Sequence, residues 1–246
     1  MCTLSWLPVP GGYSLFFNRD ESPLRGPEVP AAIHQWGDVT LVAPLDSDQG
    51  GTWIAANEFA VTIAVLNRYG PEMVRTTAPR SRGQLVRSLA TTPSPDLVSH
   101  RLAASALTDY QPFTLATTAP DSPVSLLAWN GESLEERAVK LPGLVATSSG
   151  FSSETEAARH ATLSQIQAGG PITPDVLEAF HRSHLPVRGP LSPCMHRDVA
   201  ETRSFCRVDV TSHSVEIHHV LGPPCVTTEI ARSSIARRSE PSPLSR

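Results

Sequence analysis

The sequence predicts an α+β fold in which two β-sheets pack face to face between outer layers of helices. Short apolar runs with strand patterning occur within residues 2–68, 112–148 and 205–220. Between them, residues 81–109 and 153–184 carry apolar side chains at the three-to-four spacing of amphipathic helices. Each sheet and each helix must cover one apolar face. A four-layer αββα sandwich does this for strands and helices in this order.

The first two strands are predicted to form a hairpin. Apolar runs at 2–8 and 13–17 flank Pro10-Gly11-Gly12, and glycine supplies the positive φ of a tight turn. The polar run Asn18-Arg19-Asp20-Glu21 follows directly. Antiparallel pairing returns this polar end to the start of the first strand, so we expect it beside Cys2. The alternative is a solvated hairpin end with a surface Arg–Asp pair.

The remaining elements follow from local signals. Residues 22–50 are rich in Pro, Asp and Gly and are predicted to be mostly loop, with a short strand near 39–42. Two apolar runs flank Asn57-Glu58, which predicts a second hairpin. The run Thr92-Pro93-Ser94-Pro95 separates the first two helices, and Asn130-Gly131 marks another hairpin turn.

The composition is that of an ordinary globular chain. It has 246 residues, 40% of them hydrophobic, and a net charge of −4. We expect one domain over residues 1–231 and a disordered tail over 232–246, which is rich in Ser, Arg and Pro. No basic run points to a nucleic-acid partner, and no stretch reaches the roughly 20 apolar residues of a membrane span. The N-terminus lacks a signal-peptide pattern, so we expect a cytoplasmic protein.

The four cysteines are Cys2, Cys194, Cys206 and Cys225. Their spacing is irregular, and in a chain of this length we expect them to be reduced thiols. No Cys-x-x-Cys pair is present, so neither a metal nor a cofactor is expected. His196 follows Cys194 by two residues and is interpreted as a hydrogen-bonded structural histidine.

Cys2 combines a thiol with a free α-amino group once Met1 has been removed. A small residue after Met1 is the kind that permits its removal by an aminopeptidase. The amine titrates at about 7.7–8.0 and the thiol at about 8.5, so the residue carries a nucleophile and a base. The alternative is a buried, small apolar residue on the first strand.

Met-Cys-Thr at the start, followed by Asn18-Arg19-Asp20-Glu21, resembles the NRDE family, which includes the transport and Golgi organisation proteins. That family is similar to the choloylglycine hydrolases and penicillin V acylases of the N-terminal-nucleophile hydrolase superfamily. The resemblance covers most of the chain. It implies the αββα fold of that superfamily and catalytic roles for Cys2, Arg19 and Asp20.

The resemblance implies two further site residues. In the choloylglycine hydrolases an Asn-Glu turn supplies an amide to the oxyanion hole, which implies that role for Asn57. An ordinary turn asparagine is the alternative. A Thr-Arg-Ser element before a strand implies a second arginine near the nucleophile, here Arg203. One departure is that the segment Thr147-Ser148-Ser149-Gly150 contains no asparagine, where those hydrolases have one.

These residues predict one of two functions. The first is an N-terminal cysteine amidohydrolase that cleaves a carbon–nitrogen bond in a small-molecule amide through an acyl-enzyme. The second is a non-catalytic protein of the same fold that binds and carries a hydrophobic ligand, namely a lipid, acyl-coenzyme A or haem. Haem binding requires an axial ligand, for which Cys2 or His218 is the candidate.

Overall fold

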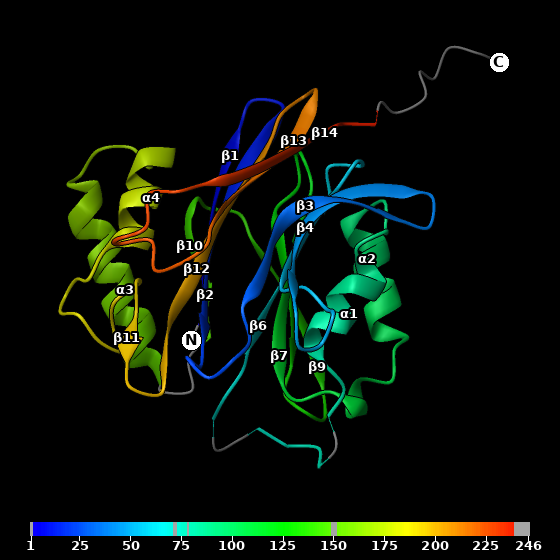
Figure 1. Ribbon diagram of the computed structural model, residues 1–246, viewed down its shortest axis with the longest axis horizontal. Helices are drawn as coiled ribbons and strands as arrows, with labels where there is room; N and C mark the ends of the chain where they lie inside the picture. Colours follow the sequence, from blue (N-terminus) through cyan, green and yellow to red (C-terminus); the bar gives the residue numbers. More distant parts are fainter. Residues whose placement is uncertain (1, 71–72, 78, 149–151, 239–246) are drawn as a thin grey trace.

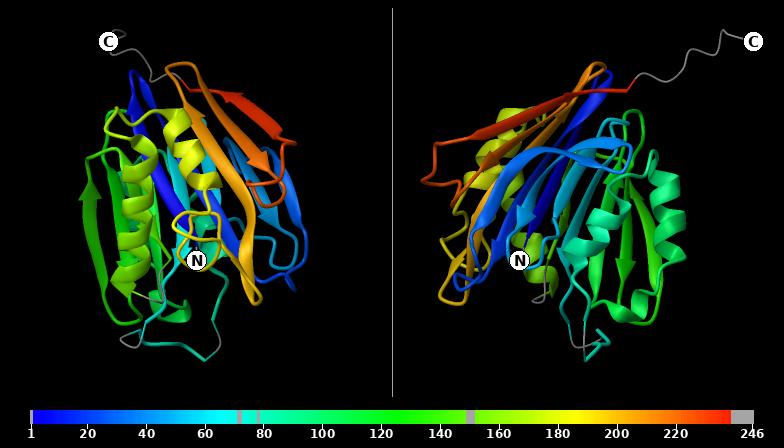
Figure 2. Two further views of the ribbon diagram at one scale, coloured as in Figure 1. Left: turned by 90° about the vertical axis from the view of Figure 1, so that its left-hand side faces the viewer. Right: turned by 45° about the vertical axis from the view of Figure 1, so that its right-hand side comes forward.

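The computed structural model contains two β-sheets stacked between two layers of helices (Figure 1). It describes residues 2–70, 73–77, 79–148 and 152–238. One helical pair covers the outer face of each sheet, as the two rotated views show (Figure 2). The predicted four-layer αββα arrangement is therefore confirmed. The helices are α1 (Arg82–Leu89), α2 (Pro95–Ala103), α3 (Ser152–Gln167) and α4 (Pro174–Arg182).

The first sheet is antiparallel, with the order β10-β1-β2-β12-β13-β14 and with β11 paired to β12. Helices α3 and α4 lie on its outer face (Figure 1). Its strands are β1 (Thr3–Val9), β2 (Gly12–Glu21), β10 (Gly143–Thr147), β11 (His196–Arg197), β12 (Ala200–Val210), β13 (Ser214–Val220) and β14 (Ala231–Ala236).

The second sheet joins its strands in chain order, from β3 to β9. Helices α1 and α2 interrupt the chain between β6 and β7 and cover its outer face (Figure 1). Its strands are β3 (Glu28–Trp36), β4 (Val39–Asp46), β5 (Ile54–Asn57), β6 (Thr62–Asn67), β7 (Phe113–Thr118), β8 (Val124–Trp129) and β9 (Leu134–Val139).

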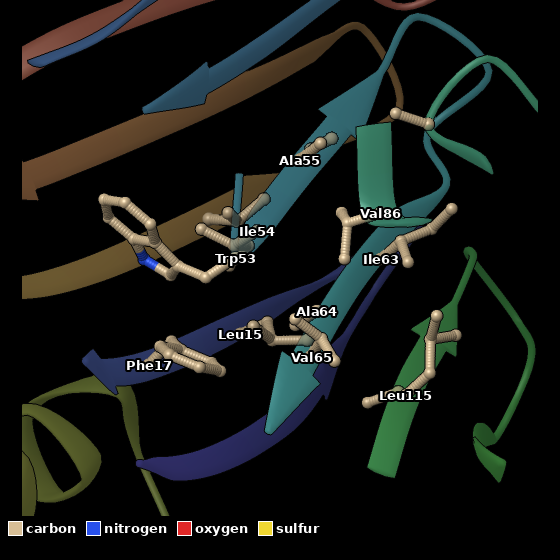
Figure 3. Packing of buried hydrophobic residues seen from close by; sticks show 14 of the residues in the cluster. Leu15, Phe17, Trp53, Ile54, Ala55, Ile63, Ala64, Val65, Val86 and Leu115 are labelled. Atoms are coloured by element: carbon tan, nitrogen blue, oxygen red, sulfur yellow. The ribbon is translucent and has the colours of Figure 1, made fainter. Parts of the chain in front are cut away.

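The main hydrophobic core lies between the two sheets. Leu15 and Phe17 of β2 pack there with Val65 of β6 and with Trp53, which directly precedes β5 (Figure 3). Phe16, between them in the sequence, points to the opposite face, because successive side chains of a strand alternate. It packs with residues of α3 and α4, which form a second hydrophobic cluster with that face. This alternation explains why β2 is apolar on both faces.

The segment predicted as mostly loop, residues 22–50, is instead a long hairpin of β3 and β4. The sequence signal for β3 is weak because this edge strand is half exposed: Ile33 is 56% exposed. Pro30 also lies within the irregularity of pairing between Val29 and Ala32, a position where a strand tolerates proline.

The tail predicted from residue 232 is wrong for its first residues. Residues 231–236 form β14, which pairs with β13 along six residue pairs and is the edge strand of the first sheet. Ile235 is buried, which fixes the strand although its neighbours are Ser, Arg and Ala. The rest of the predicted tail, from residue 239, lies outside the described residues. Among the described helices, none is both long and apolar enough to span a bilayer.

Candidate active site

The β1–β2 hairpin places Cys2 beside Asp20. Thr3 pairs with Asn18, so the start of β1 lies next to the polar end of β2. The Cys2 sulfur is 3.9 Å from the backbone oxygen of Asp20. On the other side, the Ser148 N–H donates a 2.8 Å hydrogen bond to the Cys2 carbonyl. Residue 2 is therefore held on both sides by neighbouring strand ends.

The Cys2 side chain is buried, with only 7% of the residue exposed. Burial raises the pKa of the Cys2 thiol, and the nearby charge of Asp20 acts in the same direction. The positive charge of Arg19 has a smaller, opposite effect. The thiol is therefore protonated at neutral pH, and it needs a base in contact before it can act as a nucleophile.

Thr202 of β12 orients the Asp20 side chain. The Thr202 hydroxyl donates a 2.6 Å hydrogen bond to the Asp20 carboxylate. The same oxygen accepts from the Met195 N–H at 2.8 Å, and the Thr202 N–H donates to the Met195 carbonyl at 2.8 Å. Because Thr202 is fully buried, these bonds fix one rotamer of Asp20 next to Cys2.

Arg19 is buried among acidic side chains. Its guanidinium is 2.7 Å from Glu28 and 3.5 Å from both Glu21 and Asp46, and it lies 4.5 Å from the Trp53 ring centre. Burial acts to raise the pKa of Glu28, but the hydrogen bond from His219 and the charge of Arg19 outweigh it and leave the pKa lowered. Arg19 therefore builds the wall of the site, and carboxylates neutralise much of its charge.

An open cavity of about 310 Å³ begins at Cys2. Its wall is polar and charged, and the structure brings three predicted site residues together there: Cys2, Arg19 and Asp20. Two residues that the sequence reasoning missed also line it, Asn67 at the end of β6 and Arg82 at the start of α1. Both residues lie at the end of a secondary-structure element next to a loop, where functional side chains commonly lie.

Arg159 of α3 is a second basic residue missed from the sequence. It is fully buried, and its guanidinium donates to Thr3 Oγ1 at 2.6 Å and to the Ser192 carbonyl at 3.1 Å. Burial lowers the pKa of Arg159, while the charges of Asp20 and Cys2 oppose that shift. Only the packing of α3 against the first sheet shows that this arginine is buried, so the sequence carried no clear signal for it.

Asn57, for which the resemblance implied an oxyanion role, does not line the cavity. Both of its amide N–H groups are used, at 2.9 Å each, by the carbonyls of Ala90 and Thr92. Its side-chain oxygen accepts from the N–H groups of Phe59 and Val61. Asn57 is thus the turn asparagine of the alternative interpretation, and it ties the β5–β6 hairpin to the chain between α1 and α2.

Arg203 is also absent from the cavity wall. It lies in β12 where the pairing with β2 shifts between Thr202 and Ser204. Its guanidinium is 3.6 Å from Glu201, and its side chain is 29% exposed. The resemblance implied a role near the nucleophile, but in this structure Arg203 contacts Glu201, while its neighbour Thr202 contacts Asp20.

A family comparison agrees with this geometry. The model of the family described as Transport and Golgi organisation 2 matches residues 1–167, which include both hairpins and the cavity. The chain belongs to this family. The resemblance expected from the sequence is therefore confirmed. No curated protein matches the chain significantly in sequence.

Solved structures place this member of the Transport and Golgi organisation 2 family in a wider fold group. A penicillin V acylase from Agrobacterium tumefaciens matches with a TM-score of 0.52 and 10% identity, covering 91% of this chain and 84% of that one. A mutant of the conjugated bile acid hydrolase from Clostridium perfringens matches with a TM-score of 0.52 and 11% identity, over 98% and 97%.

A third similar structure is the N-acylethanolamine-hydrolyzing acid amidase orthologue of Caenorhabditis elegans. Its TM-score is 0.57 at 8% identity, covering 84% of this chain and 92% of that one. At these identities the likeness concerns the fold alone. The expected fold of the N-terminal-nucleophile hydrolases is thereby confirmed for this chain.

Proposed function

We propose that this protein hydrolyses a carbon–nitrogen amide bond, with Cys2 as the nucleophile. The observation that carries the proposal is the position of Cys2, buried at the wall of a 310 Å³ cavity and 3.9 Å from the backbone of Asp20. The fold supports the same reading, because the structures that it resembles include two hydrolases and an acylase. A fold does not define a substrate, so the mechanism is argued from the site.

The reaction begins with cleavage of the peptide bond before Cys2, which gives this residue a free α-amino group. The amine takes the proton of the buried thiol, and the sulfur attacks the carbonyl carbon of the amide. Asp20, oriented by Thr202, holds the resulting α-ammonium group through a charge-assisted hydrogen bond.

The tetrahedral intermediate collapses when the carbon–nitrogen bond breaks. The leaving amine takes the proton from the α-ammonium group, and a thioester to Cys2 remains. Water then attacks the thioester, with the same α-amino group as base, and releases the acid and the free thiol. Every proton in this cycle passes through the one amine, which explains why the thiol needs no lowered pKa.

Asn67 replaces Asn57 in the proposal as the side-chain donor to the oxyanion. It lines the cavity that contains Cys2, whereas Asn57 uses all its hydrogen-bonding groups elsewhere. Its amide nitrogen carries two N–H groups, and one is directed to the Tyr69 hydroxyl at 2.9 Å. The second is the group proposed to stabilise the developing negative charge.

The cavity wall favours a small polar amide that carries a carboxylate. Arg82 is half-buried at the wall, and no carboxylate of the described residues forms an ion pair with it. By contrast, Arg25 pairs with Asp46 at 2.7 Å, and Arg80 pairs with Asp109 at 3.8 Å. A guanidinium without an acidic partner is a suitable site for an anionic group.

The carrier function has less support from the described residues. A lipid site is lined mainly by apolar side chains, but charged and amide side chains dominate this wall. His218, the candidate haem ligand, lies on β13 outside the wall and is 2.8 Å from Glu216. His218 is therefore not among the described residues that line the cavity at Cys2.

Intact mass and turnover of the same preparation test the enzyme. The assay uses a panel of N-acyl amino acids, and we expect release of free amine only from protein whose first residue is Cys2. Cys2→Ala should fold and lose all turnover. Cys206→Ala is the matched control, since Cys206 is also a buried cysteine but lies in the core away from the cavity. Undiminished turnover by a chain that keeps an N-terminal extension would contradict the mechanism.

Substrate preference is tested separately with Arg82→Gln. A hydrogen bond to a charged group contributes about 1.5–3 kcal/mol, so KM for a carboxylate-bearing amide should rise by about 10- to 100-fold. KM for the matching neutral amide should change little. Arg80→Gln is the matched control, because Arg80 lines the same cavity but is engaged by Asp109. Equal effects on both amides would remove Arg82 from the proposal.

A further inference from the structure

Two histidines and two cysteines from three separate segments of the chain come together in the fold. His184 follows α4, Cys194 precedes β11, His196 is the first residue of β11, and Cys225 lies between β13 and β14. One potential ligand atom from each residue lies within 4.8 Å of all the others. None of these residues lines the cavity at Cys2.

We propose that these four side chains bind one zinc ion in a closed, structural site. Two thiolates and two imidazoles are a common ligand set for structural zinc, whose coordination is tetrahedral. A fully protein-bound site leaves no open position, so it is not expected to take part in chemistry at a substrate.

The distances between the ligand atoms fit a tetrahedron. Zinc–sulfur bonds of about 2.3 Å and zinc–nitrogen bonds of about 2.0–2.1 Å place sulfur and nitrogen ligands about 3.6 Å apart. In the structure, the Nε2 atom of His196 is 3.5 Å from the sulfur of Cys194 and 3.5 Å from the sulfur of Cys225. The Nε2 atom of a neutral imidazole either carries one N–H or has one lone pair, so it forms a good hydrogen bond to only one of the two sulfur atoms.

The position of His184 also favours a metal ion. Its Nε2 atom is sealed from solvent and has no hydrogen-bond partner among the described residues. Its ring stands at 75° to that of His196, with the ring centres 5.1 Å apart, so the two imidazoles approach a common point from different directions. A buried nitrogen without a partner is costly, and a metal ion satisfies it.

The local chain conformation explains how Cys194 and His196 serve together. Residues two apart in an extended chain share one face, so both side chains point to the cluster. Met195 points to the opposite side and is fully buried. Binding through Nε2 leaves the proton of His196 on Nδ1, so the exposed Arg188, now 3.3 Å from Nδ1, must turn into solvent.

The proposed zinc ligands are linked to Asp20 through Met195 and Thr202. Met195, between two of the ligands, pairs through both its N–H and its C=O with Thr202. Thr202 in turn donates to the Asp20 carboxylate. Zinc would therefore clamp the end of α4, the start of β11 and the chain after β13 around the element that positions Asp20.

Metal content and spectroscopy test the site without reference to activity. The full chain is expressed with a tag that contains no histidine and is purified under reducing conditions in chelator-free buffer. We expect about one zinc per chain by elemental analysis. After removal of the metal, titration with cobalt(II) should give the intense visible absorption of a tetrahedral cobalt–thiolate site and saturate at about one equivalent.

Variants identify the ligands. Cys194→Ser and Cys225→Ser should each lose most of the bound zinc and the sulfur-to-cobalt absorption, whereas Cys206→Ser should retain both. Cys206 is the matched control because it is also fully buried but lies in the core between the sheets. If the cysteine variants fail to fold, His184→Ala and the cobalt spectrum of the wild-type chain answer the same question.

Amide hydrogen exchange reports the proposed clamp. Removal of zinc should speed exchange in residues 192–202 and lower Tm, while exchange in β5–β6 stays unchanged. The proposal is overturned by a folded wild-type chain that holds less than about a tenth of an equivalent of any divalent metal and gives no tetrahedral cobalt spectrum. A disulfide between Cys194 and Cys225 in freshly purified protein would overturn it equally.

Discussion

Replacing Thr202 by valine removes one hydroxyl that serves two partners. The hydroxyl donates its proton to the Asp20 carboxylate at 2.6 Å, and its oxygen accepts from the Met195 N–H at 2.8 Å; the residue is fully buried. A hydrogen bond to a charged group contributes about 1.5–3 kcal/mol, and an unpaired buried N–H costs about 1–3 kcal/mol. Burial of the added methyl group offsets about 1 kcal/mol. We therefore expect the free energy of unfolding to fall by about 2–4 kcal/mol.

The matched control is Thr117→Val. Thr117 is also fully buried in a strand, but its hydroxyl has no hydrogen-bond partner among the described residues. Replacing that hydroxyl by a methyl group should leave the free energy of unfolding unchanged or raise it. Urea denaturation followed by tryptophan fluorescence gives both values, since an unchanged m-value indicates a change in stability alone. If the two variants differ by less than about 1 kcal/mol, the hydroxyl of Thr202 does not hold Asp20 as described.

Two further predictions concern pH and the two asparagines. Burial lowers the pKa of His181 to about 3, below its value of about 6.5 in the unfolded chain. The stability that this residue contributes is complete above pH 6.5 and is lost as the pH falls from 6.5 toward 3. Between pH 7 and 5 the free energy of unfolding should fall by about 2 kcal/mol from this cause. His181→Gln should abolish that fall. If the free energy of unfolding of the variant depends on pH as that of the wild-type chain does, His181 is not the cause. Asn57→Ala should lower the free energy of unfolding by about 2–4 kcal/mol, because the four hydrogen bonds of this fully buried side chain are lost. Asn67→Ala should change the free energy of unfolding by less than about 0.5 kcal/mol and lower kcat by about 100-fold. If instead Asn57→Ala lowers kcat and Asn67→Ala does not, Asn57 is the oxyanion donor.

The sequence predicted the parts of the fold that are encoded locally. Apolar periodicity and turn residues were sufficient for the β1–β2 hairpin, the helices of residues 81–109 and the hairpin at Asn130. They failed where the local signal is weak. Edge strand β3 is half exposed and contains Pro30, and strand β14 consists mostly of small and polar residues. Both strands are defined by hydrogen bonding to the adjacent strand, β4 for β3 and β13 for β14, which the apolar pattern of the segment does not show.

The candidate site divides in the same way. The identities of Cys2 and Asp20, and their proximity, were available from the sequence because a short hairpin joins them. The partners that orient them were not, since Thr202 and Arg159 reach the site only through sheet pairing and helix packing. For Asn57, residue type and turn were predicted correctly, but the direction of its amide depends on the carbonyls of Ala90 and Thr92.

The four proposed zinc ligands show the same limit most clearly. Their spacing along the chain contains no recognisable metal motif, because they come from three segments between residues 184 and 225. Only the packing of α4, β11 and the chain after β13 brings their ligand atoms within 4.8 Å. The sequence by itself determined which chemical groups the protein carries and the local elements that present them. Tertiary structure decided which groups meet, because contacts between distant segments depend on the whole packed sheet.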